Sequence, residues 1–358
     1  RSAFYTWLNR HFKLGFKEPV IEQDYEPLKR DQLTVWDDAH PAPKADDPEF
    51  ERSLLKWFTL DAQKQLEAAA AKPDSLHQEI GSALEVLIGR TYASAGDADW
   101  LIKNKKDQGS YVEMTGLITN KTYKEEIPVT WLYPKDWKGR TIVWLDDSGK
   151  ASLFNPDGTV KAAVLKLVSA GATVVGADLL FQGEFSADNQ SVKQTRTVAN
   201  PREFAGYTYG YNHPLFAQRT HDVLTLVKYL RTAKVGTHPT PSTVEVAGFG
   251  ISTGPIVAAA RAVSGAEITH AVVDTNGFRF GKLLDYRDPQ FLPGGAKYLD
   301  LPGFLAAGAP HPLWLAGEGT EPALVAKTYK DAGKANQLTT FTGESAQKES
   351  AAAEWLLK

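Results

Sequence analysis

The sequence predicts an α/β fold, a mixed and mostly parallel sheet flanked by helices, with an N-terminal helical extension. A β-branched run at 244–249 is followed by a glycine-dense turn with Ser252 at its apex and then by a helix of small residues. From about residue 141 onward, strand-like and helix-like segments alternate, which is typical of parallel sheets. Before them, segments 111–119 and 123–133 alternate with a period of two and indicate paired antiparallel strands.

The N-terminal part of the chain differs in composition from the rest. Residues 1 to about 50 are rich in aromatic side chains and irregular in pattern, so we expect an arm that packs on the main domain. Apolar residues at helical spacing predict helices at 48–72 and 75–90, with Ser75 as the N-cap of the second. We therefore divide the chain into an arm and helical extension, 1–108, and a main domain, 109–358.

The main domain continues as strand and helix units. The apolar run 141–145 predicts a strand that is covered on both faces. We then expect a helix at 160–169, a strand at 172–177, a long loop at 178–220 and a helix at 222–233, and after the Ser252 turn strands at 268–273, 312–316 and 338–341 and a closing helix at 346–357. In such sheets, chemistry takes place beyond the carboxyl ends of the strands, so residues at those ends are the candidates for a site.

Composition excludes several classes of function. The net charge of −3 provides no basic surface for nucleic acid, and no apolar run is long enough to span a membrane. The chain has no cysteine, its histidines and acids lack metal-ligand spacing, and no dinucleotide fingerprint is present, so we expect neither metal nor cofactor. The first residue is arginine, which fits a removed signal peptide; we expect a periplasmic or secreted location, with the cytoplasm as the alternative.

Gly250-Ile251-Ser252-Thr253-Gly254 matches the G-x-S-x-G nucleophile elbow. A serine on a sharp strand-to-helix turn needs a strained backbone, and neighbours without a Cβ let the strand and the helix approach closely. Such a turn exposes the hydroxyl above the sheet and directs helix N-terminal N–H groups at the space beside it. The alternative is a phosphate-binding or purely structural glycine turn.

The order of elements from about residue 109 resembles the α/β-hydrolase fold. Within that superfamily the chain is similar to bacterial acetylxylan-esterase-like serine hydrolases. This likeness is carried by Tyr211-Asn212-His213-Pro214-Leu215 with Arg219 and Asp222-Val223-Leu224, by Gly277-Phe278-Arg279-Phe280-Gly281, and by Phe291-Leu292-Pro293-Gly294-Gly295 through Trp314-Leu315-Ala316-Gly317-Glu318. The resemblance implies that 109–358 is a catalytic domain and that the N-terminal part is a family-specific extension.

The resemblance also implies a nucleophile and an oxyanion hole. Ser252 corresponds to the nucleophile, and the backbone N–H of Thr253 to one oxyanion donor. The second donor would come from the loop after strand 141–145, which indicates Asp147 or Ser148. The neighbouring carboxylates of Asp146 and Asp147 would oppose an oxyanion unless their side chains point away.

A catalytic acid is indicated after one of two later strands, but the family's histidine is missing. Glu318 follows strand 312–316 and is the first candidate for the acid, and Asp274, directly after strand 268–273, is the second. The histidine of the family follows the last strand, where this chain has 341–348 without any histidine. Because a serine hydroxyl is a weak nucleophile without an adjacent base, this departure bears directly on activity.

Four residues are candidates to replace that histidine. His213 and His221 lie in the segment between strand 172–177 and the next helix, on the side of the sheet where chemistry is expected. Glu344 and Lys348 occupy the place where the histidine is missing. The spacing of these residues does not choose among them, and the absence of any base is a further alternative.

Two functions follow from these residues. The first is a serine carboxylic-ester hydrolase that forms an acyl-enzyme on Ser252 and deacetylates carbohydrate esters, with a small-molecule or oligosaccharide ester as its partner. The alternative is a degenerate, histidine-lacking α/β-hydrolase that binds a ligand or a partner without efficient turnover. A deliberate replacement of the histidine is a third interpretation.

Overall fold

A computed structural model describes residues 1–42, 48–199, 205–233 and 240–358, and the chain divides into two compact units at residues 56 and 57. The first unit contains helix α1 (Ser2–Phe12) and the short helix α2 (Arg30–Leu33). The expectation of an irregular arm is wrong for Ser2–Phe12, which form helix α1. The side-chain amide of Asn9 forms two hydrogen bonds with the backbone of Phe16 and so ties the helix to the loop that follows it.

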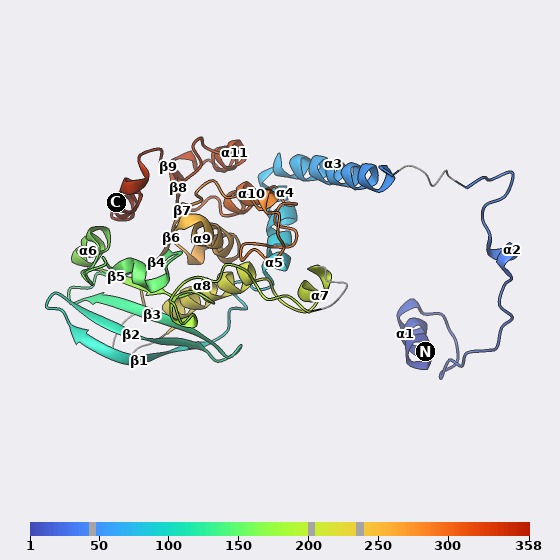
Figure 1. Cartoon of the computed structure of the whole chain (residues 1–358), viewed down its shortest axis with the longest axis horizontal. Helices are drawn as coiled ribbons and strands as arrows, with labels where there is room; N and C mark the ends of the chain where they lie inside the picture. Colours follow the sequence, from blue (N-terminus) through green and yellow to red (C-terminus); the bar gives the residue numbers. More distant parts are fainter. Residues whose placement is uncertain (43–47, 200–204, 234–239) are drawn as a thin grey trace. The chain divides into compact units, whose positions relative to one another are not determined.

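The second unit is organised around one mixed sheet (Figure 1). The strand order is β1-β2-β3-β5-β4-β6-β7-β8-β9, with antiparallel pairing from β1 to β3 and between β3 and β5, and parallel pairing from β5 through β9. The strands are β1 (Ala98–Asp107), β2 (Tyr111–Asn120), β3 (Glu125–Pro134), β4 (Arg140–Asp146), β5 (Ala172–Ala177), β6 (Thr243–Phe249), β7 (His270–Asp274), β8 (Leu313–Ala316) and β9 (Leu338–Thr340). This is the mostly parallel sheet that the sequence predicts.

Strand β1 was not predicted from the sequence. The C-terminal half of β1 contains Lys103, Lys105 and Lys106, a composition that resembles a polar loop. The strand nevertheless pairs along its length with β2. Lysines are frequent on edge strands because they discourage further pairing. The sheet thus begins at Ala98, ahead of the division expected at 108/109, and the functional division of the chain stays a prediction.

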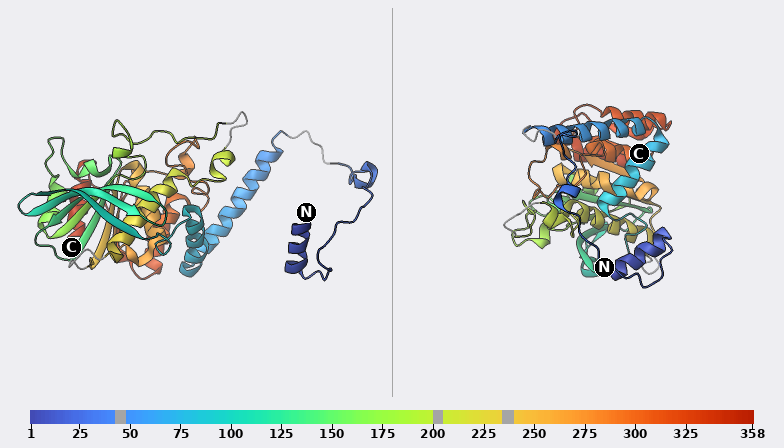
Figure 2. Two further views of the ribbon diagram at one scale, coloured as in Figure 1. Left: turned by 90° about the horizontal axis from the view of Figure 1, so that it is seen from below. Right: turned by 90° about the vertical axis from the view of Figure 1, so that its right-hand side faces the viewer.

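Helices cover both faces of the sheet (Figures 1 and 2). One face packs against α6 (Ala162–Ser169) and α12 (Lys348–Leu356), and the other against α5 (Ser82–Ile88), α8 (Leu215–Thr232), α9 (Gly250–Ser264) and α10 (Asp300–Ala307). Each face of the sheet has its own hydrophobic core, and successive residues of the buried strands pack into one core and then the other. In β4, Ile142 and Trp144 face α6 and α12, whereas Val143 and Leu145 face the other side. This alternation is the period of two expected of a strand that is buried on both faces.

The remaining helices are α3 (Phe50–Ala70), α4 (Pro73–Leu76), α7 (Ala205–Tyr209) and α11 (Ala323–Asp331). Helix α8 begins at Leu215, after Pro214, rather than at Asp222 as expected. The expected long loop therefore ends earlier, and α7 lies within it. No helix in the described parts of the chain is long and apolar enough to cross a membrane.

Candidate functional site

The elbow at Ser252 lies at the carboxyl end of β6, between β4 and β7 in the sheet. Gly250 has a φ of +90°, a conformation that costs a residue with a side chain free energy. Gly254 packs directly on the backbone carbonyl of Asp274, where any Cβ would collide. The glycines of the motif thus permit the turn and the close contact between α9 and β7, as the motif predicts.

The elbow N–H groups already hold a negatively charged group, the side chain of Asp147. Its Oδ1 accepts hydrogen bonds from the backbone nitrogens of Ser252 (3.1 Å) and Thr253 (2.9 Å), and from the Thr253 hydroxyl (2.8 Å). A methyl group at Gly250 would strike this carboxylate, so the glycine also makes room for it. The helix N-terminus is therefore an anion site that the protein fills with its own side chain.

Burial raises the pKa of the Asp147 carboxyl, and the three hydrogen bonds from Ser252 and Thr253 oppose that rise. The nearby Asp146 raises the pKa further by charge repulsion. From the sequence, the backbone N–H of Asp147 is a candidate oxyanion donor. The structure instead places the Asp147 side chain at the Thr253 N–H, where the oxyanion would be. In this position the carboxylate would repel an oxyanion, as expected from the sequence for acids that do not point away.

Ser148, the other candidate donor, is also engaged. Its backbone nitrogen and its hydroxyl bond to Oδ1 of Asp146, at 2.9 and 2.6 Å. The Asp146 carboxylate thus points away from the elbow and closes a tight turn after β4. In this arrangement the Ser148 N–H is not free to serve an oxyanion.

Ser252 itself is partly buried, and its hydroxyl makes no hydrogen bond with any residue in the described ranges. The side chain of Gln290 stabilises the turn around Ser252, and no role for this residue was predicted from the sequence. The Gln290 amide donates to the backbone carbonyls of Ile251 (3.0 Å) and Ser252 (3.1 Å) and is almost fully buried. Gln290 therefore positions the elbow from a separate loop, without contacting the serine hydroxyl.

Asp274, the second candidate acid, pairs with Lys348. The Lys348 Nζ lies 2.8 Å from both carboxylate oxygens, and both side chains are largely buried. Lys348 begins α12 after the last strand, in the place where the family's histidine is missing. An ion pair of this geometry uses the ammonium form of lysine, which has no lone pair to accept a proton.

Glu318, the first candidate acid, pairs with Arg279. The guanidinium donates from both terminal nitrogens to the two carboxylate oxygens, and the Nη1–Oε1 distance is 3.0 Å. The hydrogen bond that Arg279 donates to Glu318 raises the pKa of Arg279. Both candidate acids thus hold a cation where a triad acid would hold a histidine, and neither pairing was predicted.

The two histidine candidates lie together at another site, beside the end of α5. The Nε2 of His221 bonds to the backbone carbonyl of Ile88 at 2.7 Å, and the His213 ring packs against His221 and Gly89. Burial, with the nearby positive charge of Arg90, lowers the pKa of His221 to about 4. Neither histidine bonds to Ser252 in the part of the chain that the structure describes.

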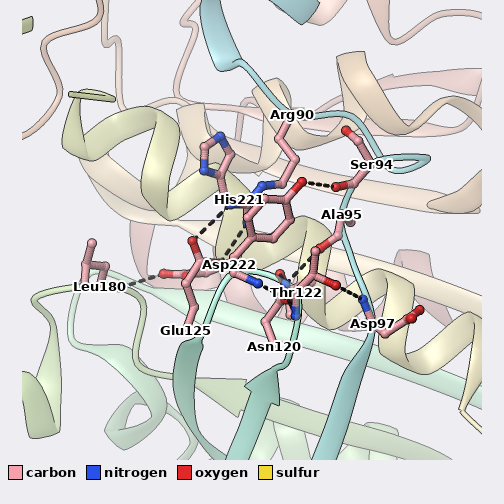
Figure 3. A network of polar contacts seen from close by, with 12 residues as sticks. Arg90, Ser94, Ala95, Asp97, Asn120, Thr122, Glu125, Leu180, His221 and Asp222 are labelled. Atoms are coloured by element: carbon pink, nitrogen blue, oxygen red, sulfur yellow. Dashed lines mark hydrogen bonds and ion pairs between the residues drawn. The ribbon is translucent and has the colours of Figure 1, made fainter. Parts of the chain in front are cut away.

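The polar network around His221 is structural (Figure 3). Arg90 pairs with both oxygens of Glu125, at 2.8 and 3.0 Å, and stacks over the ring of Tyr123. Asp222, the next residue of α8, accepts the backbone N–H of Leu180. The network joins α8, β3 and the segment after α5, and this packing explains why His221 faces away from the elbow.

Glu344, the remaining candidate, has an exposed side chain in the loop before α12 and forms no side-chain hydrogen bond with a described residue. The described residues also contain no group of three or more histidines and acids that could hold a metal ion.

Several solved structures with a similar fold are described as esterases. A protein from Bacteroides fragilis NCTC 9343, provisionally described as an acetyl xylan esterase, is 15% identical with a TM-score of 0.51 and 76% of each chain covered. A glucuronoyl esterase from Solibacter usitatus is 13% identical with a TM-score of 0.50, covering 79% of this chain and 94% of its own. No protein-family model and no curated protein matches the sequence. At these identities the likeness confirms the α/β-hydrolase fold that the sequence predicts.

Proposed function

We propose that this protein is a serine carboxylic-ester hydrolase that acts through an acyl-enzyme on Ser252. The observation that carries the proposal is the anion site at the elbow, where the N–H groups of Ser252 and Thr253 gather a carboxylate beside the serine. A carboxylate oxygen held there marks the place where the oxyanion of a tetrahedral intermediate would be stabilised. The neighbours with this fold are carbohydrate esterases, which supports carbohydrate esters as the substrate class.

The proposed reaction follows from this geometry. The Ser252 Oγ attacks the ester carbonyl carbon, and its proton passes through water to the oxygen of the departing alcohol. The carbonyl oxygen takes the place of the Asp147 carboxylate at the Thr253 N–H. The alcohol leaves with a proton, and water then hydrolyses the acyl-serine to release the acid and regenerate the hydroxyl. Asp147 must therefore leave the anion site before attack, so its side chain would control access to the oxyanion hole.

A second function is favoured by a specific observation. The place of the missing histidine is taken by Lys348 in an ion pair with Asp274, and among the described residues no base forms a hydrogen bond with the Ser252 hydroxyl. A serine without a base reacts slowly. The second candidate is therefore a degenerate hydrolase that binds an ester or a partner at the elbow without efficient turnover.

Labelling with a fluorophosphonate probe, alongside hydrolysis of p-nitrophenyl acetate, tests the first function. We expect labelling that is lost in Ser252→Ala and retained in Ser148→Ala, a matched control because Ser148 lies at the same end of the sheet. Absence of both labelling and hydrolysis in the unmodified chain would contradict the hydrolase and favour the second function. In that case, activity gained by Glu344→His or Ser345→His would show that only the base is missing.

The secreted or periplasmic location stays a prediction. Cell fractionation of the source organism with an antibody against the chain would test it.

A further inference from the structure

A cavity lies at the opposite end of the sheet from Ser252. It has a volume of about 510 Å³ and is lined by residues that include Thr141 and Thr173, near the beginnings of β4 and β5. Ser252 follows the carboxyl end of β6, which runs parallel to β4. The cavity is therefore separate from the elbow, and its volume is in the range of about 300–1,000 Å³ typical of ligand pockets.

Five aromatic residues contribute to its wall. Trp100, Trp131, Tyr133, Trp137 and Tyr229 line what we call the aromatic pocket. Trp100 and Trp131 lie 5.6 Å apart between ring centroids, Tyr229 meets Trp131 edge-on at 6.2 Å, and Tyr133 and Trp137 form a second pair at 5.9 Å. Three of the rings stand on strands β1 and β3, one on α8, and that of Trp137 follows the end of β3, so most of this wall is built on regular elements.

Three polar groups in this wall have no hydrogen-bond partner among the residues that the structure describes. The indole nitrogens of Trp100 and Trp131 and the hydroxyl of Tyr229 form no hydrogen bond with any residue of the described ranges. Burial raises the pKa of Tyr229 to about 12, so its hydroxyl stays neutral and able to donate. None of the three atoms is fully enclosed by the described residues, so a ligand with hydroxyl groups in the pocket would reach these donors and accept hydrogen bonds from them.

These features fit a carbohydrate better than an acyl chain. A pyranose ring has apolar C–H faces, which stack on aromatic rings, and hydroxyl groups at its edge, which accept from indole and phenol donors. An acyl chain would satisfy none of the three donors. At the rim, the ammonium of Lys135 is held 2.8 Å from Asp107, which adds polar groups where a chain of sugars would leave the pocket.

We propose that the aromatic pocket is a glycan-binding site, distinct from the Ser252 site, that takes a few pyranose units of a polysaccharide. Its role as an anchor for the polymer whose esters Ser252 would cleave rests on the proposed function. The binding itself does not, because the pocket shares no lining residue with the elbow.

Titration calorimetry of the full chain with xylohexaose, which carries no ester, tests this binding. Trp100→Leu removes one stacking face and is expected to weaken binding at least tenfold. Tyr229→Phe keeps the ring and removes only the unpartnered hydroxyl, for which we expect a loss of about fivefold. Trp57→Leu, which removes an exposed tryptophan of α3, is the matched control and should bind as the unmodified chain does.

The outcome is separable from the fate of the hydrolase. Binding that depends on Trp100 and Tyr229 supports the glycan site even if Ser252 fails to react with a fluorophosphonate. Absence of xylohexaose binding, or binding that neither substitution weakens, overturns it. Binding of dodecanoate that depends on Trp100, in a chain that does not bind xylohexaose, would likewise overturn it in favour of an acyl site.

Discussion

Removal of the Asp147 side chain tests the interpretation of the elbow as an oxyanion hole. The carboxylate occupies the N–H of Thr253 at 2.9 Å and that of Ser252 at 3.1 Å. If it stayed while an oxyanion formed about 3 Å away, repulsion at an effective dielectric constant of about 20 would cost about 5 kcal/mol, or roughly 10⁴ in rate. Catalysis therefore requires the carboxylate to move out and its three hydrogen bonds to break.

Asp147→Ala frees the same donors permanently. A single oxyanion donor is worth about 10²–10³ in rate, so we expect kcat/KM for p-nitrophenyl acetate to rise by about 10². Asp146→Ala is the matched control, because that acid lies beside Asp147 but bonds to Ser148 rather than to the elbow. The assay is initial-rate hydrolysis, with fluorophosphonate labelling as a second readout of Ser252.

Two results would refute this reasoning. An Asp147→Ala rate equal to or below that of the unmodified chain, with Ser252 still labelled, would show that the carboxylate does not block the hole. A gain that survives in the double variant with Ser252→Ala would show that the added hydrolysis does not pass through the elbow serine.

Further predictions concern stability, measured by urea unfolding. The pKa of His221 in the folded chain is about 4, below its ordinary value. Its contribution to the free energy of unfolding is therefore full above about pH 6.5 and falls by about 3 kcal/mol as the pH drops to 4. The difference in unfolding free energy between the unmodified chain and His221→Gln should show this slope. Burial raises the pKa of Asp222 to about 7. Its contribution to the free energy of unfolding is therefore full below about pH 4 and falls by about 4 kcal/mol as the pH rises to 7, so the comparison with Asp222→Asn should show the opposite slope. A difference in unfolding free energy that does not change with pH would contradict the pKa of the residue that was replaced. Arg140→Met removes the arginine partner of the fully buried Glu245 carboxylate, leaves His270 Nδ1 at 3.5 Å as its neighbour, and should cost about 3–5 kcal/mol. A loss under about 1 kcal/mol would show that the pair with Arg140 is not needed. Gln290→Ala breaks two buried hydrogen bonds to the elbow and should cost about 1–3 kcal/mol, with an unchanged unfolding midpoint as the contrary result.

Local patterns were sufficient for much of the fold. The elbow could be recognised because a β-branched strand, closely spaced glycines and a small-residue helix are neighbours in the sequence. The buried strands could be recognised because a two-residue period assigns each side chain to one face, as Ile142 and Val143 show. Strand β1 escaped because its lysines, which suit an edge strand, resemble a loop.

The sequence by itself determined the α/β architecture, the place of Ser252 and the absence of a histidine after the last strand. Only the tertiary structure decided what surrounds that serine. The contacts of Asp147 with the elbow, of Lys348 with Asp274 and of Arg279 with Glu318 join residues 105, 74 and 39 positions apart. Local propensity carries no information about such pairs. They form because parallel strands bring their carboxyl ends to one edge of the sheet, where charged side chains from distant loops meet in partial burial and must pair.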